Sequence, residues 1–108
     1  MKIKLKKFKI VESTNDIAFK LIKKNFSEPT LITTEKQTKG RGRIGKKWVS
    51  IKGNLFISLF FRLDQKKINF KQFAVLNAFL LKKVISKLIR KKLTIKWPND
   101  LLFNKHKL

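Results

Sequence analysis

Three polar segments of the chain contain the residue types that bind anions or take part in proton and group transfer. The first is Ser13-Thr14-Asn15-Asp16, which precedes apolar residues at helical spacing. Ser-x-x-Asp at such a place is typical of a helix N-terminal cap, although Glu or Gln is the usual fourth residue of a capping box. The free amides and small hydroxyls of a helix start can also hydrogen-bond a polar ligand. Taken alone, the segment favours the cap.

The second segment is the basic, glycine-rich stretch Gly40-Arg41-Gly42-Arg43-Ile44-Gly45-Lys46-Lys47-Trp48. Its spacing matches G-x-x-x-x-G-K, but Lys47 stands where a phosphate-binding P-loop needs Ser or Thr for Mg²⁺, and a strand-like segment follows instead of a helix. A P-loop is therefore excluded. Backbone amides and guanidinium groups could still hold a phosphate, and Trp48 could stack on a base of RNA. Taken alone, such a segment is more often a solvated loop than a phosphate-binding or RNA-binding loop.

The third segment is Lys96-Trp97-Pro98-Asn99-Asp100, with Lys107 seven residues beyond the aspartate. A strand closed by a Pro-Asn-Asp turn is a common structural device. The same residues offer an amide, a carboxylate and a nearby lysine. Such a set suits a nucleotide, a metal-bound phosphate or an incoming amine.

The hydrophobic pattern predicts the elements that must position these segments. We expect strands at 3–11 and 31–34, a helix of about two turns after Ser13, and a polar loop at 36–47. Paired strands are expected at 48–50 and 55–63, a helix at 70–90, a strand at 93–97, and a hairpin that turns at 104–106. The resulting class is α+β, a mixed and largely antiparallel sheet with helices packed on it.

Composition excludes several kinds of site. The chain has no Cys and one His among 108 residues, so disulfides, thiolate metal sites and a Cys nucleophile are excluded, and we expect no protein metal site. Twenty-eight Lys and Arg against six Asp and Glu give a net charge of +22, which favours an anionic partner without choosing one. No secretory signal or membrane-spanning run is visible, and we expect a soluble cytoplasmic protein.

The order and spacing of the segments are more informative than any one of them. Ser13-Thr14-Asn15, then Gln37-x-x-Gly40-Arg41-Gly42-Arg43-x-Gly45-x-x-Trp48, then Gly53-Asn54-Leu55, then Lys96-Trp97-Pro98-Asn99-Asp100 resemble the catalytic domain of biotin–protein ligases. The resemblance runs from about residue 8 to the last residue, and lipoate ligases of the same superfamily lack this combination. It implies a biotin/lipoate ligase fold, similar to that of class II aminoacyl-tRNA synthetases. Residues 1–108 would be the N-terminal part of a single, incomplete catalytic domain.

The resemblance also implies a two-step reaction. The carboxylate of biotin attacks the α-phosphate of ATP, usually with Mg²⁺, and gives biotinyl-5′-AMP and pyrophosphate. A lysine of a biotin carboxyl carrier protein, an acetyl-CoA carboxylase subunit, then attacks the mixed anhydride. Positive groups must screen the two anions that meet in the first step.

The family's functional residues carry over by position, as an implication of the resemblance. Lys107 and Arg43 would be catalytic, Lys107 by bridging the biotin carboxylate and the α-phosphate. Gly53 and Asn54 would let the ligand approach the sheet closely. The expected biotin-binding residues are Ser13, Thr14, Asn15, Gln37, Arg41, Gly42, Arg43 and Lys107, and the expected nucleotide-binding residues are Arg41, Arg43, Trp48, Asn99 and Asp100.

The chain departs from the family pattern at both ends. No helix-turn-helix region precedes residue 8, so the chain resembles the non-repressor class, and operator DNA binding is not expected. The sequence stops at Leu108, directly after the expected catalytic lysine, where family members continue, so a complementary C-terminal fragment is an expected partner and independent activity is in question. The alternative function is a small basic nucleic-acid-binding protein, whose affinity would fall steeply with salt.

Overall fold

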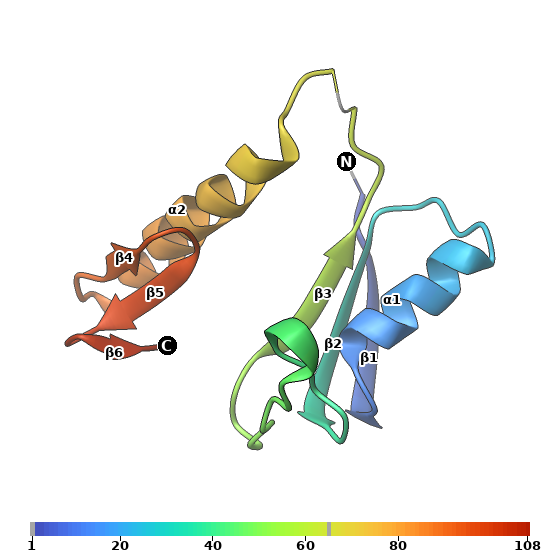
Figure 1. The fold of residues 1–108 in the computed structure, drawn as a ribbon, viewed down its shortest axis with the longest axis horizontal. Coiled ribbons are helices and arrows are strands. Elements are labelled where there is room, and N and C mark those ends of the chain that lie inside the picture. The colour runs from blue at the N-terminus through green and yellow to red at the C-terminus, as the bar shows by residue number, and fades with distance from the viewer. Residues whose placement is uncertain (1, 65) are drawn as a thin grey trace. The chain divides into compact units, whose positions relative to one another are not determined.

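The chain is described by a computed structural model that covers residues 2–64 and 66–108. Its internal contacts divide it into two compact units, Met1–Arg62 and Leu63–Leu108. Each unit is described by itself below (Figure 1). The expectation that both belong to one catalytic domain stays a prediction.

The first unit is a three-stranded sheet with one helix. Strand β1 (Lys4–Val11) pairs in parallel with β2 (Thr30–Gln37), and β2 pairs antiparallel with β3 (Phe56–Phe60), in the order β1-β2-β3. Parallel neighbours need a crossover connection, and helix α1 (Thr14–Lys23) supplies it (Figure 1). A short 3₁₀ turn, η1 (Arg43–Gly45), lies in the loop between β2 and β3.

The core of this unit lies between α1 and one face of the sheet. Thr30, Ile32 and Thr34 alternate along β2 and are buried, and Ile32 has no exposed surface. Phe56 lies opposite Thr34 and is buried on the same face, and Ala18 is the buried apolar residue of α1. The β-branched residues of β2 therefore serve both as good strand formers and as the packing layer under the helix.

The second unit is a helix with a small antiparallel sheet. It contains α2 (Phe70–Ile89), β4 (Thr94–Lys96), β5 (Asp100–Phe103) and β6 (His106–Lys107), with the sheet order β4-β5-β6. Asn69 caps α2, because its side chain accepts a hydrogen bond of 3.0 Å from the Lys71 amide. Leu93 has no exposed surface and Ala78 is buried. No helix in 2–64 or 66–108 is long and apolar enough to cross a membrane.

Most expected elements are confirmed, including the opening strand, both helices, the strand near 94 and the final hairpin. Helix α1 has 10 residues, and so is longer than the two turns expected. The expected strand at 48–50 and its pairing with 55–63 are wrong. The Trp48 amide donates to the Gly40 carbonyl at 2.9 Å, while β3 pairs with β2 instead. The β-branched strand β2 offers β3 a continuous ladder, which the short segment 48–50 cannot match.

Candidate active site

The start of α1 and the loop after β2 come together because β1 and β2 are parallel neighbours. Val11 and Gln37 are register partners at the carboxyl ends of these strands, and each strand is followed directly by one of the polar segments. Residues that follow neighbouring parallel strands lie at the same edge of a sheet. The topology thus brings Ser13-Thr14-Asn15 to the glycine–arginine loop, which we define as residues 40–48.

Ser13 is the N-cap of α1, as the sequence indicates. Its side chain accepts a hydrogen bond of 3.5 Å from the Asp16 amide, and its backbone is extended. Ser13 and Thr14 are both buried, with 4% of their surface exposed. In a full capping box the side chain of the fourth residue bonds back to the N-cap amide. Here the Asp16 carboxylate pairs with Arg41 instead.

Gln37 connects the helix start to the far end of the loop. Its side-chain carbonyl accepts from the Thr14 amide at 2.9 Å and from the Thr14 hydroxyl at 3.2 Å. Its amide nitrogen donates to the buried Ser50 hydroxyl at 3.2 Å. Thr14 and Gln37 are both expected biotin-binding residues, and the structure brings these two residues into contact.

Ser58 of β3 is a residue of this network that the sequence analysis missed. Its hydroxyl donates to the Thr14 hydroxyl at 2.8 Å and also contacts the Asn15 side-chain amide. A hydroxyl has one proton, so Ser58 can donate to only one of these partners. If the Asn15 amide group is oriented so that its nitrogen donates to the Ser58 oxygen, both contacts are hydrogen bonds. A single hydroxyl in the otherwise apolar strand Phe56–Phe60 is the signal that could have identified it.

The glycine–arginine loop is closed at its base by backbone bonds. Arg41 and Lys47 form an isolated antiparallel bridge, and the Gly42 amide donates to the Lys46 carbonyl at 2.6 Å. Gly40 is buried, and a Cβ atom there would stand 2.9 Å from both the Ser50 hydroxyl and the Trp48 carbonyl. With the residues just before and after it, the loop lines a hollow of about 770 Å³. The motif glycine at 40 is thus required by close packing.

The two arginines of the loop differ in their contacts. Arg41 donates from Nη1 to Asp16 Oδ2 at 3.0 Å and from Nη2 to Asp16 Oδ1, so the ion pair is bidentate. This hydrogen bond with Arg41 holds the pKa of the Asp16 carboxyl below 3.8, against a smaller opposing effect of burial. The same bond raises the pKa of Arg41. Arg43 is exposed and forms no ion pair with any residue in the described part of the chain.

The lowered pKa of Asp16 gives a prediction for its titration. Because the folded-state pKa is depressed, the ion pair contributes fully above pH 3.8, and its contribution is lost as the pH falls through the folded-state pKa. In carboxyl-detected NMR, the midpoint of Asp16 is expected below 3.8 in the wild type and close to 3.8 in Arg41→Gln. Equal midpoints in the two proteins would contradict the pairing.

Trp48 and the turn Gly53-Asn54 lie on the surface of the first unit. Half of the Trp48 surface is exposed, and its indole borders the hollow of the loop. Gly53 has a φ of 103°, which L side chains rarely adopt, and Asn54 forms an isolated bridge with Lys52. Contact of Trp48 with adenine, and of the Gly53-Asn54 turn with ligand, stay predictions.

The remaining expected site residues lie in the second unit. Asp100 begins β5 and Lys107 lies on β6, and the Lys107 ammonium is 3.0 Å from Asp100 Oδ1. Asn99 is exposed beside them, in the turn after the cis Trp97–Pro98 peptide. The hairpin therefore brings together Lys107 and Asp100. The structure joins the site residues in two clusters, one per unit.

The described residues do not form a protein cage for a metal ion. No group of three or more His, Asp or Glu lies together in 2–64 or 66–108. Asp16 and Asp100 are each paired with a cation, Arg41 and Lys107. In nucleotide-binding enzymes, Mg²⁺ is commonly coordinated by the substrate phosphates and by only one or two protein carboxylates. The Mg²⁺ expectation therefore stays a prediction, and no step below depends on it.

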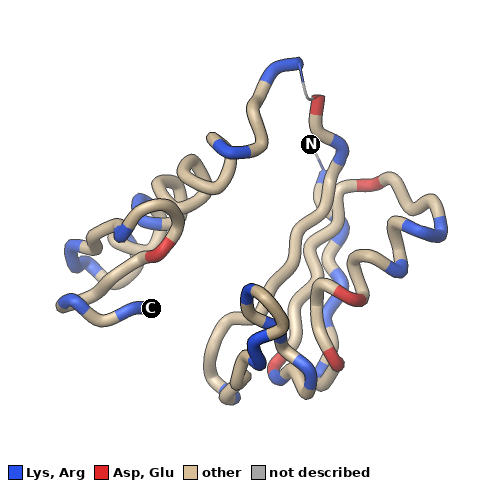
Figure 2. Tube along the Cα trace, in the orientation of Figure 1, with Lys and Arg blue, Asp and Glu red and all other residues tan. Residues whose placement is uncertain are grey.

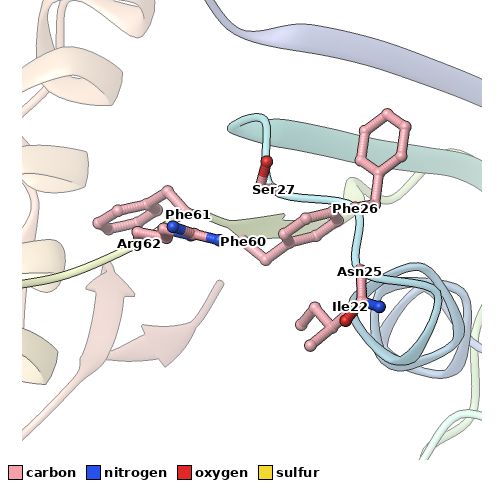
Figure 3. A pocket seen from close by; sticks show the side chains of 7 residues that line it. All are labelled: Ile22, Asn25, Phe26, Ser27, Phe60, Phe61 and Arg62. Atoms are coloured by element: carbon pink, nitrogen blue, oxygen red, sulfur yellow. The ribbon is translucent and has the colours of Figure 1, made fainter.

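A second hollow of the first unit lies away from these residues. It has about 240 Å³ and is placed at the C-terminal end of α1, whereas Ser13 is at the N-terminal end. Figure 3 shows the Phe26 and Phe60 rings on its wall, which meet edge to face at a centroid distance of 6.4 Å. No residue of the motif segments lines this hollow. It is therefore separate from the candidate active site.

The fold is α+β and matches that of solved biotin protein ligases. The chain belongs to the biotin/lipoate A/B protein ligase family, whose model matches residues 7–108.

Individual relatives agree with this assignment. The chain is 36% identical over 96 residues to the bifunctional ligase/repressor BirA of Bacillus subtilis, covering 88% of this chain and 30% of that protein. It resembles the biotin protein ligase of Aquifex aeolicus in complex with biotin and ATP, at 32% identity and a TM-score of 0.80, over 96% of this chain and 43% of that one. It also resembles the biotin acetyl coenzyme A carboxylase synthetase of Helicobacter pylori with bound biotinylated ATP, at 29% identity and a TM-score of 0.84, over 98% of this chain and 52% of that one. The chain thus spans about a third of its curated relative and about half of the solved structures.

Proposed function

We propose that this chain carries part of the active site of a biotin–protein ligase, which joins biotin to AMP and transfers it to a lysine of a biotin carboxyl carrier protein. The observation that carries the proposal is the network of Thr14, Gln37 and Ser58 beside the glycine–arginine loop. Its support is the similarity, at 32% identity, to a ligase solved with biotin and ATP.

The two ends of biotin need different partners, and the first unit offers both kinds. The ureido ring is neutral and polar, so uncharged side chains of the Thr14 network can satisfy it without burying a charge. The carboxylate and the phosphates are anionic, so they need cations. Arg43 is exposed and unpaired among the described residues, and is the group we assign to the phosphate.

The proposed reaction consists of two substitutions. In the first, a carboxylate oxygen of biotin attacks the α-phosphorus of ATP, the bond to the β-phosphate oxygen breaks, and pyrophosphate leaves. In the second, a carrier lysine amine attacks the acyl carbon, loses a proton, and releases AMP. Lys107 is proposed to bridge the two anions of the first step, where a fixed positive charge lowers their repulsion.

The proposal includes the setting of the reaction. The partner protein is a biotin carboxyl carrier protein, and a complementary C-terminal fragment is a further proposed partner. Operator DNA is not a proposed ligand. A cytoplasmic location is proposed because the reaction consumes ATP.

Biotin-dependent exchange between ATP and pyrophosphate tests the proposal directly. The chain together with the complementary part of a relative is expected to catalyse exchange that depends on biotin, and the same assay on the chain alone measures its independent activity. Lys107→Ala and Arg43→Ala are each expected to lower the rate at least about tenfold, as removal of a charged contact to a developing anion does. Lys83→Ala, an exposed lysine of α2, is the control and is expected to leave the rate unchanged.

Calorimetry with biotin and with a biotinyl-AMP analogue gives the outcome that would overturn the proposal. Binding of neither ligand, to the chain alone or to the complemented chain, would show that the site does not function as a ligase site.

The nucleic-acid alternative gains no specific support. Lys and Arg occur on most elements of both units and are not confined to one of them (Figure 2). A dispersed positive charge attracts any polyanion weakly, so it does not distinguish a nucleic acid from ATP. Binding of RNA with a steep salt dependence, together with no binding of biotin, would restore this alternative.

A further inference from the structure

The Asp16–Arg41 ion pair is the most specific polar contact of the glycine–arginine loop with the rest of the first unit. Both guanidinium nitrogens at the end of Arg41 meet both oxygens of the Asp16 carboxylate, one of them at 3.0 Å. A planar fork on a carboxylate fixes direction as well as distance, which a lysine in place of Arg41 could not do. The carboxylate is the more enclosed partner, with 29% of its side chain exposed against 54% for Arg41.

Both partners stand on parts of the chain that other contacts hold. Asp16 lies in the first turn of α1, next to the Thr14 and Asn15 side chains that bond to Gln37 and Ser58. Arg41 directly follows Gly40, whose backbone is packed against the Trp48 carbonyl. The ion pair therefore ties the start of the loop to the helix turn that holds the polar network.

The pairing also changes which arginine can serve a ligand. The positive charge of Arg41 is compensated by Asp16 at hydrogen-bond distance. Arg43, two residues further, has no such compensation among the described residues. An anion that recruits Arg41 must first break a bidentate pair, whereas one that recruits Arg43 displaces only water.

We propose that Asp16 is a positioning residue, whose ion pair with Arg41 fixes the glycine–arginine loop for ligand binding, while Arg43 supplies the charge to the bound anion. This inference rests on the proposed ligase function. It assigns Asp16 a role outside the capping of α1. It also assigns Arg41 a structural role in place of the direct nucleotide contact expected from its position in the motif.

Two readouts test the inference, one of which needs no ligand. Trypsin cleavage after Arg43, Lys46 and Lys47 reports on opening of the loop, and calorimetry reports on biotin affinity. Asp16→Asn and Arg41→Gln are each expected to raise the cleavage rate and to weaken biotin binding by about 2- to 5-fold, the effect of an ion pair worth up to about 1 kcal/mol. The charge-swapped double variant Asp16→Arg/Arg41→Asp restores the ion pair in the opposite direction. It is expected to bring the cleavage rate and the biotin affinity most of the way back to the wild-type values.

Glu12→Gln is the matched control. It removes another partly exposed ion pair near the loop, Glu12 with Lys39 at 3.4 Å, and is expected to leave cleavage and biotin affinity unchanged.

Three results would overturn the inference. Unchanged cleavage in Asp16→Asn would show that the pair does not hold the loop. Tighter binding of biotin or ATP by Asp16→Asn would show that the Asp16–Arg41 ion pair competes with the ligand. Loss of binding in Arg41→Gln without recovery in the swapped variant would show that Arg41 contacts the ligand itself. A wild-type chain that binds no biotin would instead refute the ligase function, while cleavage still tests the ion pair.

Discussion

Replacement of Gly40 with alanine is expected to weaken biotin binding by about 10- to 100-fold, because overpacking at a closed site costs about 1–3 kcal/mol. The new Cβ atom would stand 2.9 Å from the Trp48 carbonyl and from the Ser50 hydroxyl, and 3.2 Å from Gln37 Nε2. A backbone carbonyl cannot rotate away as the end of a flexible side chain can. The strain must move Trp48 or Gln37, and Gln37 holds Thr14 at the helix start.

Gly42→Ala is the steric comparison for this prediction and is expected to weaken biotin binding less than Gly40→Ala, although Gly42 is itself an expected biotin-binding residue. The nearest atoms to a Cβ at Gly42 are Lys46 Cβ and the Lys46 carbonyl, both at 3.5 Å, which is ordinary van der Waals contact. Its φ of −94° suits any residue. Calorimetry on both variants, with far-UV circular dichroism to confirm folding, makes the comparison. Equal affinities for biotin in Gly40→Ala and the wild type would show that the packing at Gly40 does not shape the site.

Ile32→Ala is expected to lower the free energy of unfolding by about 2–5 kcal/mol, the usual cost of such a truncation in a core. Ile32 lies in the central strand β2 and has no exposed surface. Its register partners are Lys6 on β1 and Ser58 on β3, so the cavity would open beneath the residue that holds Thr14. Urea denaturation followed by circular dichroism is expected to show a lower midpoint and an unchanged slope.

Ile57→Ala is the control, because Ile57 is on the adjacent strand β3 and has 43% of its surface exposed. It is expected to lower the free energy of unfolding by about 1 kcal/mol or less, since little of its side chain leaves water on folding. A larger loss in Ile57→Ala than in Ile32→Ala would place the core on the opposite face of the sheet.

The sequence was sufficient for the elements with a strong pattern. Alternating apolar and charged residues predicted a strand at 3–11, observed as Lys4–Val11, and the long amphipathic stretch predicted a helix at 70–90, observed as Phe70–Ile89. Ser13 was recognised as a helix cap because a hydroxyl before an apolar helix has a local role. These features depend on neighbours along the chain, which a sequence shows directly.

The sequence also showed that the polar segments from Ser13 to Asp100 follow the motif order of one protein family. It did not determine the partner of β3, because strand pairing joins residues far apart and competes among several candidates. Segment 48–50 has a strand-like composition, but its backbone bonds to Gly40. The tertiary structure decided this competition in favour of β2.

Side-chain pairing at the site was likewise decided by the tertiary structure. Asp16 reads as part of a helix cap, yet its carboxylate pairs with Arg41, 25 residues away. Ser58 reads as one more strand residue, yet it bonds to Thr14, 44 residues away. Motif spacing specifies which residues are present and in what order. The parallel pairing of β1 with β2, the antiparallel pairing of β2 with β3, and the crossover of α1 together place these side chains within hydrogen-bond distance.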